Sequence, residues 1–115
     1  MKYLSLVSVF HVSDIEKSSA WYKKWIDGEE VVPEDGVAEY KITGDSWLQL
    51  SLAQKNTFEK SSVILGVEDI IKAKKYLDGK GITTSEIADY GVVKIVEIND
   101  PDGNSIFFAQ EIYPV

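Results

Sequence analysis

The chain has 115 residues, of which 44% are hydrophobic and 27% charged, a composition typical of one globular domain. Its net charge of −7, with no cluster of lysines to offset the acidic excess, argues against binding nucleic acid, whose phosphates would be repelled. The absence of cysteine excludes disulfides and thiolate metal sites. No stretch resembles a signal peptide or the roughly 20 apolar residues of a membrane span, so we expect a cytoplasmic protein with no membrane partner.

The first half of the chain predicts a strand, a helix and three further strands. The opening stretch "MKYLSLVSVFHV" shows strand-like alternation. Ser13 and Glu16 have the spacing of a capping box, so we expect a helix to begin there. The apolar stripe of this helix comprises Ile15, Ser18, Tyr22 and Trp25. Strand-like runs separated by turns follow at about 29–33, 37–43 and 46–52.

The second half repeats this order of elements. An apolar strand over 62–67 precedes a helix that ends at "DGKG", and strand-like runs follow at about 83–88, 91–98 and 104–111. The stripe of this second helix comprises Ile70, Ala73 and Leu77. An offset of 55 positions matches Val12 with Val67, Asp14 with Asp69, Ile15 with Ile70, Lys17 with Lys72 and Trp21 with Tyr76. We therefore predict an α+β protein of two tandem βαβββ modules, about 1–53 and about 60–113.

A turn precedes the last strand, in the stretch "NDPDGN". Pro101 fixes φ for an early turn position, Asp100 and Asp102 can bond neighbouring backbone amides, and Gly103 can take φ > 0 without steric cost. We expect these residues to shape the chain and not to contact a ligand.

One face of four predicted strands is almost wholly apolar, as expected for a sheet face that a helix covers. Its residues are Leu4, Leu6, Phe10 and Val12; Leu48, Leu50 and Leu52; Val63, Leu65 and Val67; Ile106, Phe108 and Ile112.

The opposite faces mix aromatic, aliphatic and uncharged polar residues. They comprise Ser5, Val7, Val9 and His11; Trp47, Gln49 and Ser51; Ser62, Ile64 and Gly66; Ser105, Phe107 and Ala109. A solvated face would be richer in lysine and glutamate, and a sealed core would lack glutamine and serine. Such a mixture is typical of a ligand cavity, although a second packing surface or a subunit interface is the alternative.

Three features together resemble the vicinal oxygen chelate superfamily of glyoxalases, extradiol dioxygenases and bleomycin-resistance proteins. They are the tandem βαβββ modules, the "VSDIEKSSAWYKKWIDGEE" opening and the "DPDGNSIFF" ending, and they cover essentially the whole chain. One departure is Asp27 before Gly28, where the family usually has an apolar residue. The resemblance implies a single domain in which two curved mixed sheets, related by a pseudo-twofold, enclose a cleft. It also implies a homodimer, in which the cleft is sometimes shared between subunits.

Enzymes of this family hold a divalent metal with His and Glu from the first and last strands of each module. Matched by motif, those positions are Val7, Gln49, Ser62 and Phe107. Valine and phenylalanine offer no lone pair, while serine and glutamine are weak neutral ligands, so we expect no metal and no other cofactor. His11 is the only histidine and lies four residues past the ligand position, and one imidazole cannot assemble the site.

The favoured function is therefore a metal-free protein that sequesters a small molecule, as in the bleomycin-resistance branch, rather than an enzyme. Trp47 and Phe107 would supply stacking area, and several uncharged groups would orient polar atoms. The expected ligand-binding residues are Val7, Val9, His11, Trp47, Gln49, Ser51, Ser62, Ile64, Ser105 and Phe107. The acidic net charge is compatible with a cationic ligand, but it places no carboxylate in the cleft.

Two alternatives stay open. One is a lyase or other enzyme of the superfamily with an absent or non-standard metal site, in which His11 acts as general base or acid. The other is a dimeric regulatory or interaction domain whose cleft is plugged by its own side chains or by a partner subunit.

Overall fold

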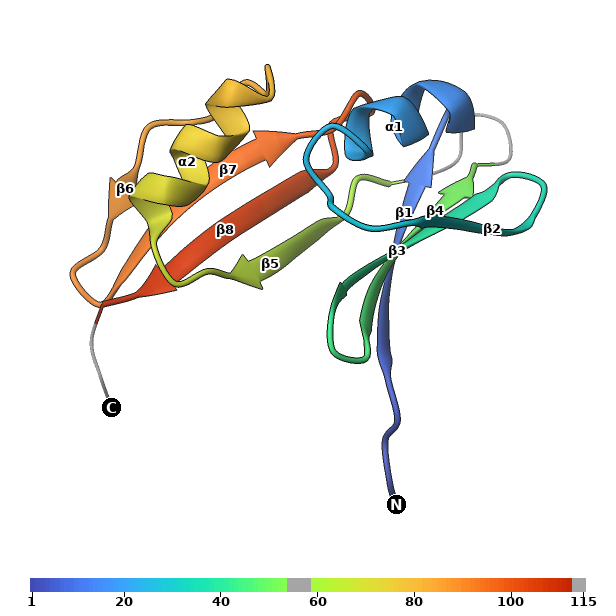
Figure 1. Ribbon diagram of the computed structural model, residues 1–115, viewed down its shortest axis with the longest axis horizontal. Helices are drawn as coiled ribbons and strands as arrows, with labels where there is room; N and C mark the ends of the chain where they lie inside the picture. Colours follow the sequence, from blue (N-terminus) through green and yellow to red (C-terminus); the bar gives the residue numbers. More distant parts are fainter. Residues whose placement is uncertain (54–58, 113–115) are drawn as a thin grey trace. The chain divides into compact units, whose positions relative to one another are not determined.

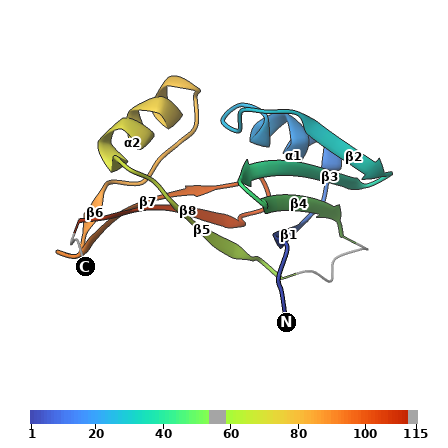
Figure 2. The ribbon, with the colours of Figure 1, turned by 60° about the horizontal axis from the view of Figure 1, so that its bottom comes forward.

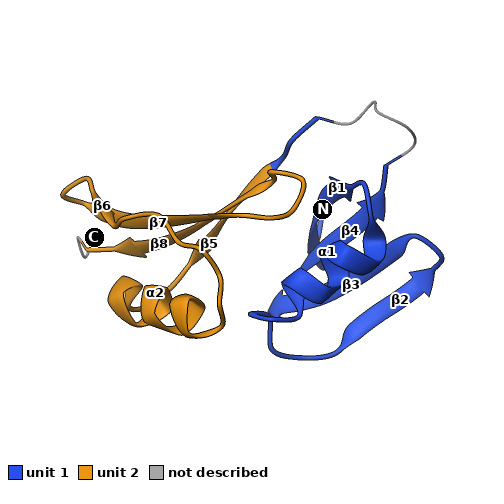
Figure 3. Cartoon of the chain, turned by 90° about the horizontal axis from the view of Figure 1, so that it is seen from above, with its two compact units in different colours: residues 1–61 blue, residues 62–115 orange. Residues whose placement is uncertain are grey.

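The computed structural model describes residues 1–53 and 59–112. The chain divides into two compact units, residues 1–61 and residues 62–115, which are coloured separately in Figure 3. Each unit contains the element order βαβββ, so the predicted α+β fold of two tandem modules is confirmed.

The first unit is a four-stranded mixed sheet with one helix (Figure 1). Its elements are β1 (Leu6–Val12), α1 (Ile15–Tyr22), β2 (Glu30–Glu34), β3 (Val37–Thr43) and β4 (Ser46–Leu52). The strand order is β1-β4-β3-β2, with β1 parallel to β4 and the other neighbours antiparallel. β2 lies at an edge and contains Pro33, which has no N–H to donate to a ladder, and its pairing with β3 shifts register between Val31 and Glu34.

Helix α1 covers one face of this sheet (Figure 2). Its N-cap is Asp14, whose Oδ1 accepts a hydrogen bond from the Lys17 backbone N–H at 3.1 Å. The predicted Ser13–Glu16 capping box is therefore wrong by one residue, because the aspartate one position later satisfies the free amide. The helical stripe is buried as predicted at Ser18 and Tyr22, and the Tyr22 ring stacks on Tyr40 of β3 with centroids 6.1 Å apart.

The second unit repeats this arrangement. Its elements are β5 (Ser62–Gly66), α2 (Ile70–Gly79), β6 (Ala88–Asp89), β7 (Val93–Asn99) and β8 (Ser105–Glu111), with strand order β5-β8-β7-β6. β5 is parallel to β8, as β1 is to β4. Asp69 caps α2 by accepting from the backbone N–H of Ile71 and Lys72, both at 3.1 Å. The two N-caps, Asp14 and Asp69, stand at the offset of 55 that the sequence repeat predicts.

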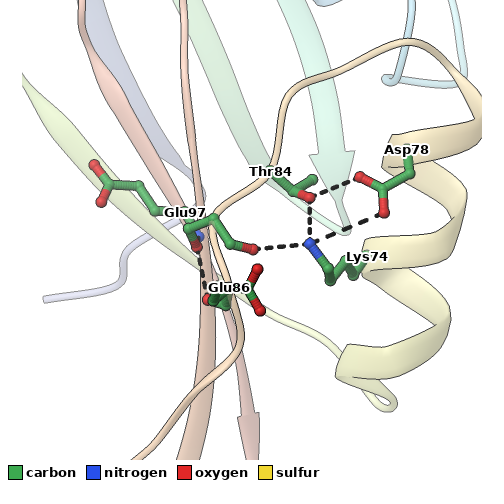
Figure 4. A network of polar contacts seen from close by, with 6 residues as sticks. Lys74, Asp78, Thr84, Glu86 and Glu97 are labelled. Atoms are coloured by element: carbon green, nitrogen blue, oxygen red, sulfur yellow. Dashed lines mark hydrogen bonds and ion pairs between the residues drawn. The ribbon is translucent and has the colours of Figure 1, made fainter.

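The predicted strand over 83–88 is mostly absent, and β6 is limited to two residues. Ser85 is the reason. Its backbone N–H donates to the Glu97 carbonyl at 3.0 Å, but its side-chain Oγ, not its carbonyl, accepts from the Glu97 N–H at 2.7 Å. The Ser85 carbonyl instead accepts from Lys74 Nζ on α2 at 2.9 Å (Figure 4). A side chain thus takes the place of a backbone acceptor, and the ladder stops there.

The same lysine joins a polar network that holds this loop on α2. Lys74 Nζ donates to Thr84 Oγ1 at 2.6 Å, and Thr84 Oγ1 donates to Asp78 Oδ1 at 2.6 Å. Lys74 Nζ also lies 3.9 Å from Asp78 Oδ2, one helical turn away. Side-chain contacts therefore fix the segment that the sequence pattern assigns to a strand.

The turn before β8 has the conformation expected from its residues. Asp100 Oδ1 accepts from the backbone N–H of Asp102 at 2.9 Å and of Asn104 at 2.8 Å, and Gly103 has φ of 87°. Asp100 and Asn104 are both buried, and Asn104 Nδ2 donates to Asp100 Oδ2 at 2.9 Å. The turn is thus held by its own polar side chains.

The apolar faces are buried under the helices where the strands are central and exposed where they end. Phe10, Val12, Leu48, Leu50, Ile106 and Phe108 are buried as predicted. Leu4, Leu6, Leu52 and Ile112, predicted on the same faces, are exposed because they lie at or beyond strand ends. Val63, Leu65 and Val67 are only half-buried, since β5 forms an edge. In the described residues, neither helix is long and apolar enough to span a membrane.

Candidate functional site

In the first unit, the predicted site residues lie on one face of two neighbouring strands. The parallel register pairs Val7 with Trp47, Val9 with Gln49 and His11 with Ser51. Because alternate side chains point to opposite faces, these six share the face that lies away from α1. We call this surface mixed face 1; its further members are Val31, Val37, Glu39 and Lys41, from β2 and β3.

The second unit has an equivalent surface on the face away from α2. Ser62 pairs with Ser105 and Ile64 with Phe107, so all four predicted residues share it. We call it mixed face 2; its further members are Gly66, Ala109, Ile95, Glu97 and Asn99.

Both faces leave apolar side chains partly in contact with water. Val7 is 45% exposed and Ile64 is 67% exposed, whereas Phe108 on the helix side of β8 is 6% exposed. Trp47, Gln49 and Phe107 have intermediate exposure. Such surfaces are neither sealed core nor fully solvated strand faces, as the sequence predicts.

Each mixed face also carries a carboxylate that the sequence analysis missed. Glu39 of β3 lies opposite Gln49, whose Nε2 donates to Glu39 Oε2 at 2.9 Å. Glu97 of β7 lies opposite Phe107 and accepts at Oε2 from Ser105 Oγ at 2.9 Å and from Asn99 Nδ2 at 3.1 Å. Neither glutamate is among the ligand-binding residues predicted from the sequence. Alternation along the third strand of each module, with Tyr40 and Val96 buried, is the signal that would have found them.

The four residues at the predicted metal positions do not fit a metal ion. Val7 and Phe107 have no donor atom, Gln49 is engaged with Glu39, and Ser62 is a weak neutral ligand. Within residues 1–53 and 59–112, no three His, Cys, Asp or Glu side chains come together in a way that could hold a metal.

A hollow of about 420 Å³ opens in the first unit beside Trp47. It lies where β2 begins, β3 ends and β4 begins. Its walls are formed by Asp27, Gly28, Glu29, Val31, Lys41, Ile42, Thr43 and Trp47. The volume falls in the range of small-molecule sites, and Trp47 is the one predicted site residue among its walls.

A second polar group of this unit, between α1 and the sheet, has a structural role. Glu30 Oε2 accepts from Ser19 Oγ and, at 2.5 Å, from Tyr40 Oη, while Lys23 Nζ lies 3.8 Å from Oε1. Burial acts to raise the pKa of Glu30, but the two hydrogen bonds and the lysine charge outweigh it and leave that pKa below its usual value. Burial and the bond to Glu30 raise the pKa of the Tyr40 phenol. These groups tie α1 to β2 and β3.

Comparison with known proteins places this geometry in a known fold. No family model matches the sequence, and no curated protein matches it. Among solved structures, a glyoxalase/bleomycin resistance protein from Catenulispora acidiphila DSM 44928 is similar with a TM-score of 0.82 and 23% identity, covering 97% of this chain and 100% of that one.

Two further similar structures are named as an enzyme and as an antibiotic resistance protein. A lactoylglutathione lyase from Agrobacterium tumefaciens has a TM-score of 0.76 and 18% identity, covering 91% of each chain. The fosfomycin resistance protein FosX from Mesorhizobium loti has a TM-score of 0.69 and 18% identity, covering 96% of this chain and 92% of that one. The chain therefore has the fold that these glyoxalase, bleomycin resistance and fosfomycin resistance proteins share.

Proposed function

We propose that the protein binds a small molecule without a metal and that its ligand-binding residues lie on mixed faces 1 and 2. The observation that carries this proposal is the makeup of the faces. Each presents a half-exposed aromatic ring, Trp47 or Phe107, beside aliphatic and polar groups, and neither is covered by a helix of its own unit. Rings supply contact area and the polar groups fix orientation, which is how small-molecule sites are built.

The proposed ligand-binding residues are those predicted from the sequence, with Glu39 and Glu97 added. Aromatic stacking would come from Trp47 and Phe107. Polar contacts would come from Gln49, Ser51, Ser62, Ser105 and His11, and aliphatic contacts would come from Val7, Val9 and Ile64. We further propose that the protein works in the cytoplasm and that it forms a homodimer. The edge strands β1 and β5 support the homodimer, because they present exposed aliphatic side chains that a second copy could cover.

Metal analysis of protein purified without chelator tests the metal-free part of the proposal. We expect no stoichiometric Zn²⁺, Ni²⁺ or Mn²⁺, because Val7 and Phe107 have replaced possible ligands with hydrocarbon. About one ion per chain, lost on replacement of Gln49 by Ala, would contradict the assignment of the four positions.

Catalysis is the second candidate function, and the lyase among the similar structures is the observation that favours it. His11 would act as general acid or base from mixed face 1, where it lies opposite Ser51. Turnover of a glutathione thioester or hemithioacetal that is abolished by His11→Ala, with unchanged stability, would establish the enzyme and replace the binding proposal.

A further inference from the structure

Helix α2 presents a face to solvent on which apolar and basic side chains lie together. We call it the basic face of α2; its residues, all exposed, are Ile71, Lys72, Lys75 and Tyr76. Ile71 is 61% exposed and Tyr76 is 40% exposed. Ile71 and Lys75 are four positions apart, as are Lys72 and Tyr76, so the four residues form one surface. Lys80, one residue past the helix, lies with its Nζ 5.4 Å from the centre of the Tyr76 ring and adds a further positive charge.

This face is not a requirement of the fold, because the equivalent helix of the first unit lacks it. The offset of 55 places Glu16 of α1 at the position of Ile71, and Ala20 at the position of Lys75. Both helices nevertheless belong to units with the same element order. An exposed apolar group rimmed by charges is typical of a surface that contacts another protein, so the difference between the modules points to a contact made by α2.

The charge of the basic face is available to a partner. Residues 71–80 contain four of the chain's twelve lysines and a single acidic residue, in a chain whose net charge is −7. Lys74 is held within its own unit by Thr84 and Asp78. In the described parts of the chain, neither Lys72 nor Lys75 forms an ion pair. An acidic surface would therefore fit this face, whereas a basic one would be repelled.

The chain itself carries a complementary surface on the edge strand β2 of the first unit (Figure 3). Residues 25–40 contain six acidic residues and no lysine. Val32 is 59% exposed, and Glu34 and Asp35 beside it are exposed as well; we call these three residues the acidic edge of β2. Pro33 has no N–H to donate, which disfavours pairing of this edge with another strand and leaves side-chain contacts as the way to cover it.

We propose that the basic face of α2 in one copy of the chain docks on the acidic edge of β2 in a second copy. Lys72 and Lys75 then face Glu34 and Asp35, and Ile71 supplies an apolar contact. Because the two surfaces differ and each copy carries both, the contact joins copies head to tail. It assumes no arrangement of the two units within one chain. It is separate from ligand binding and from the strands β1 and β5 of the proposed homodimer.

Sedimentation equilibrium of the full chain over a wide range of protein concentrations tests this contact. At about 0.1 M salt the average mass should rise with concentration, and at about 1 M salt it should fall back, because the Debye length shrinks from about 10 Å to about 3 Å. An assembly held by the aliphatic side chains of β1 and β5 should instead persist at high salt, so the two contacts are distinguishable.

Charge reversal identifies the two surfaces. Lys72→Glu combined with Lys75→Glu should weaken the salt-dependent association about tenfold or more, and so should Glu34→Lys combined with Asp35→Lys. Mixing the two variants should restore association, because the first retains the acidic edge and the second retains the basic face. All four substitutions in one chain should restore it too, because both surfaces are then reversed in charge.

Matched controls exclude effects of overall charge and of unfolding. Lys17→Glu combined with Lys24→Glu makes the same change in net charge at exposed positions on and just after α1, and it should leave association unchanged. Circular dichroism of each variant verifies that it is folded.

Several results would overturn the inference. They are a mass that does not depend on concentration and salt, association that neither charge reversal weakens, and association that the fourfold variant does not recover. A chain that stays monomeric, but loses stability with each reversal and regains it in the fourfold variant, would place the contact within one chain and overturn the role of a second copy. Each of these results leaves the proposed ligand binding intact.

Discussion

Replacing Phe107 and Phe108 by alanine, side by side, decides whether mixed face 2 is the wall of a ligand site or a packed surface. The two rings are neighbours on β8 and point to opposite faces. Phe108 is buried beneath α2, whereas Phe107 is half-exposed and lies between Ile64 of β5 and Glu97 of β7. The pair is therefore its own matched control for residue type, strand and position.

The expected losses of stability differ because the two rings differ in burial. Phe108→Ala opens a cavity in the core and should lower the free energy of unfolding by about 3–5 kcal/mol. Fully burying a phenylalanine contributes about 1.5–3 kcal/mol, so truncating a half-exposed Phe107 should cost only about 1–2 kcal/mol. Truncation should nevertheless weaken ligand binding, because the stacking area is lost.

Urea unfolding monitored by circular dichroism gives both free energies, and benzamidine titration gives the binding change. Equal losses of about 3–5 kcal/mol for the two variants, with no binding to lose in the wild type, would refute the proposed site. That result would mean that mixed face 2 is covered by other side chains of the same chain or by a partner subunit.

Three further changes test other parts of the structure. Ser18 is fully buried and its hydroxyl has no hydrogen-bond partner among the described residues, so Ser18→Ala should raise the free energy of unfolding by about 1 kcal/mol; a clear loss in urea unfolding would reveal a missing partner. Gly103 has φ of 87°, so Gly103→Ala should cost about 1 kcal/mol or more while binding by the folded protein stays normal, and a variant with full stability but no binding would place the turn in the site. Glu30 has a folded-state pKa below its usual value of 4.5, so its contribution is present at neutral pH and is lost as the pH falls through that lowered pKa. Stability measured from pH 6 to pH 2.5 should therefore decline less steeply in Glu30→Gln than in the wild type; parallel curves would contradict this role.

The alternation of apolar residues along the sequence predicted the sheets correctly, because buried and exposed side chains alternate along their strands. Alternation in β1 and β4 assigned Phe10 and Leu50 to the helix side and Val9 and Gln49 to the other side, and the register agrees. The offset of 55 pairs Asp14 with Asp69, which are the two N-caps, since each module needs an aspartate to satisfy the same free amides. The repeat also shows a difference between the modules. Ser18, whose buried hydroxyl has no hydrogen-bond partner among the described residues, aligns with Ala73 in the second module.

Two features depend on contacts that the local pattern does not encode. The run at 83–88 has strand-forming residues, but the Ser85 hydroxyl replaces a backbone acceptor, which depends on Glu97 and Lys74 lying beside it. Glu39 and Glu97 were missed for a different reason. Both are charged residues in mid-strand, and charge alone usually indicates a solvated position; only the pairing with the last strand shows that they share a face with Gln49 and Phe107.

The connection between β1 and β4 has a consequence for how each module assembles. Hairpins β3–β4 and β7–β8 join segments that are neighbours in sequence, but the parallel pairs join Leu6 to Ser46 and Ser62 to Ser105, about 40 residues apart. Closing such long loops costs chain entropy that a short hairpin avoids, so β1 and β5 should be the last strands to dock and the first to detach. They carry Val7, Val9, His11, Ser62 and Ile64, half of the predicted ligand-binding residues. A ligand bound there would therefore stabilise each module at its least stable strand. Local opening of that strand would then determine the rate of ligand release.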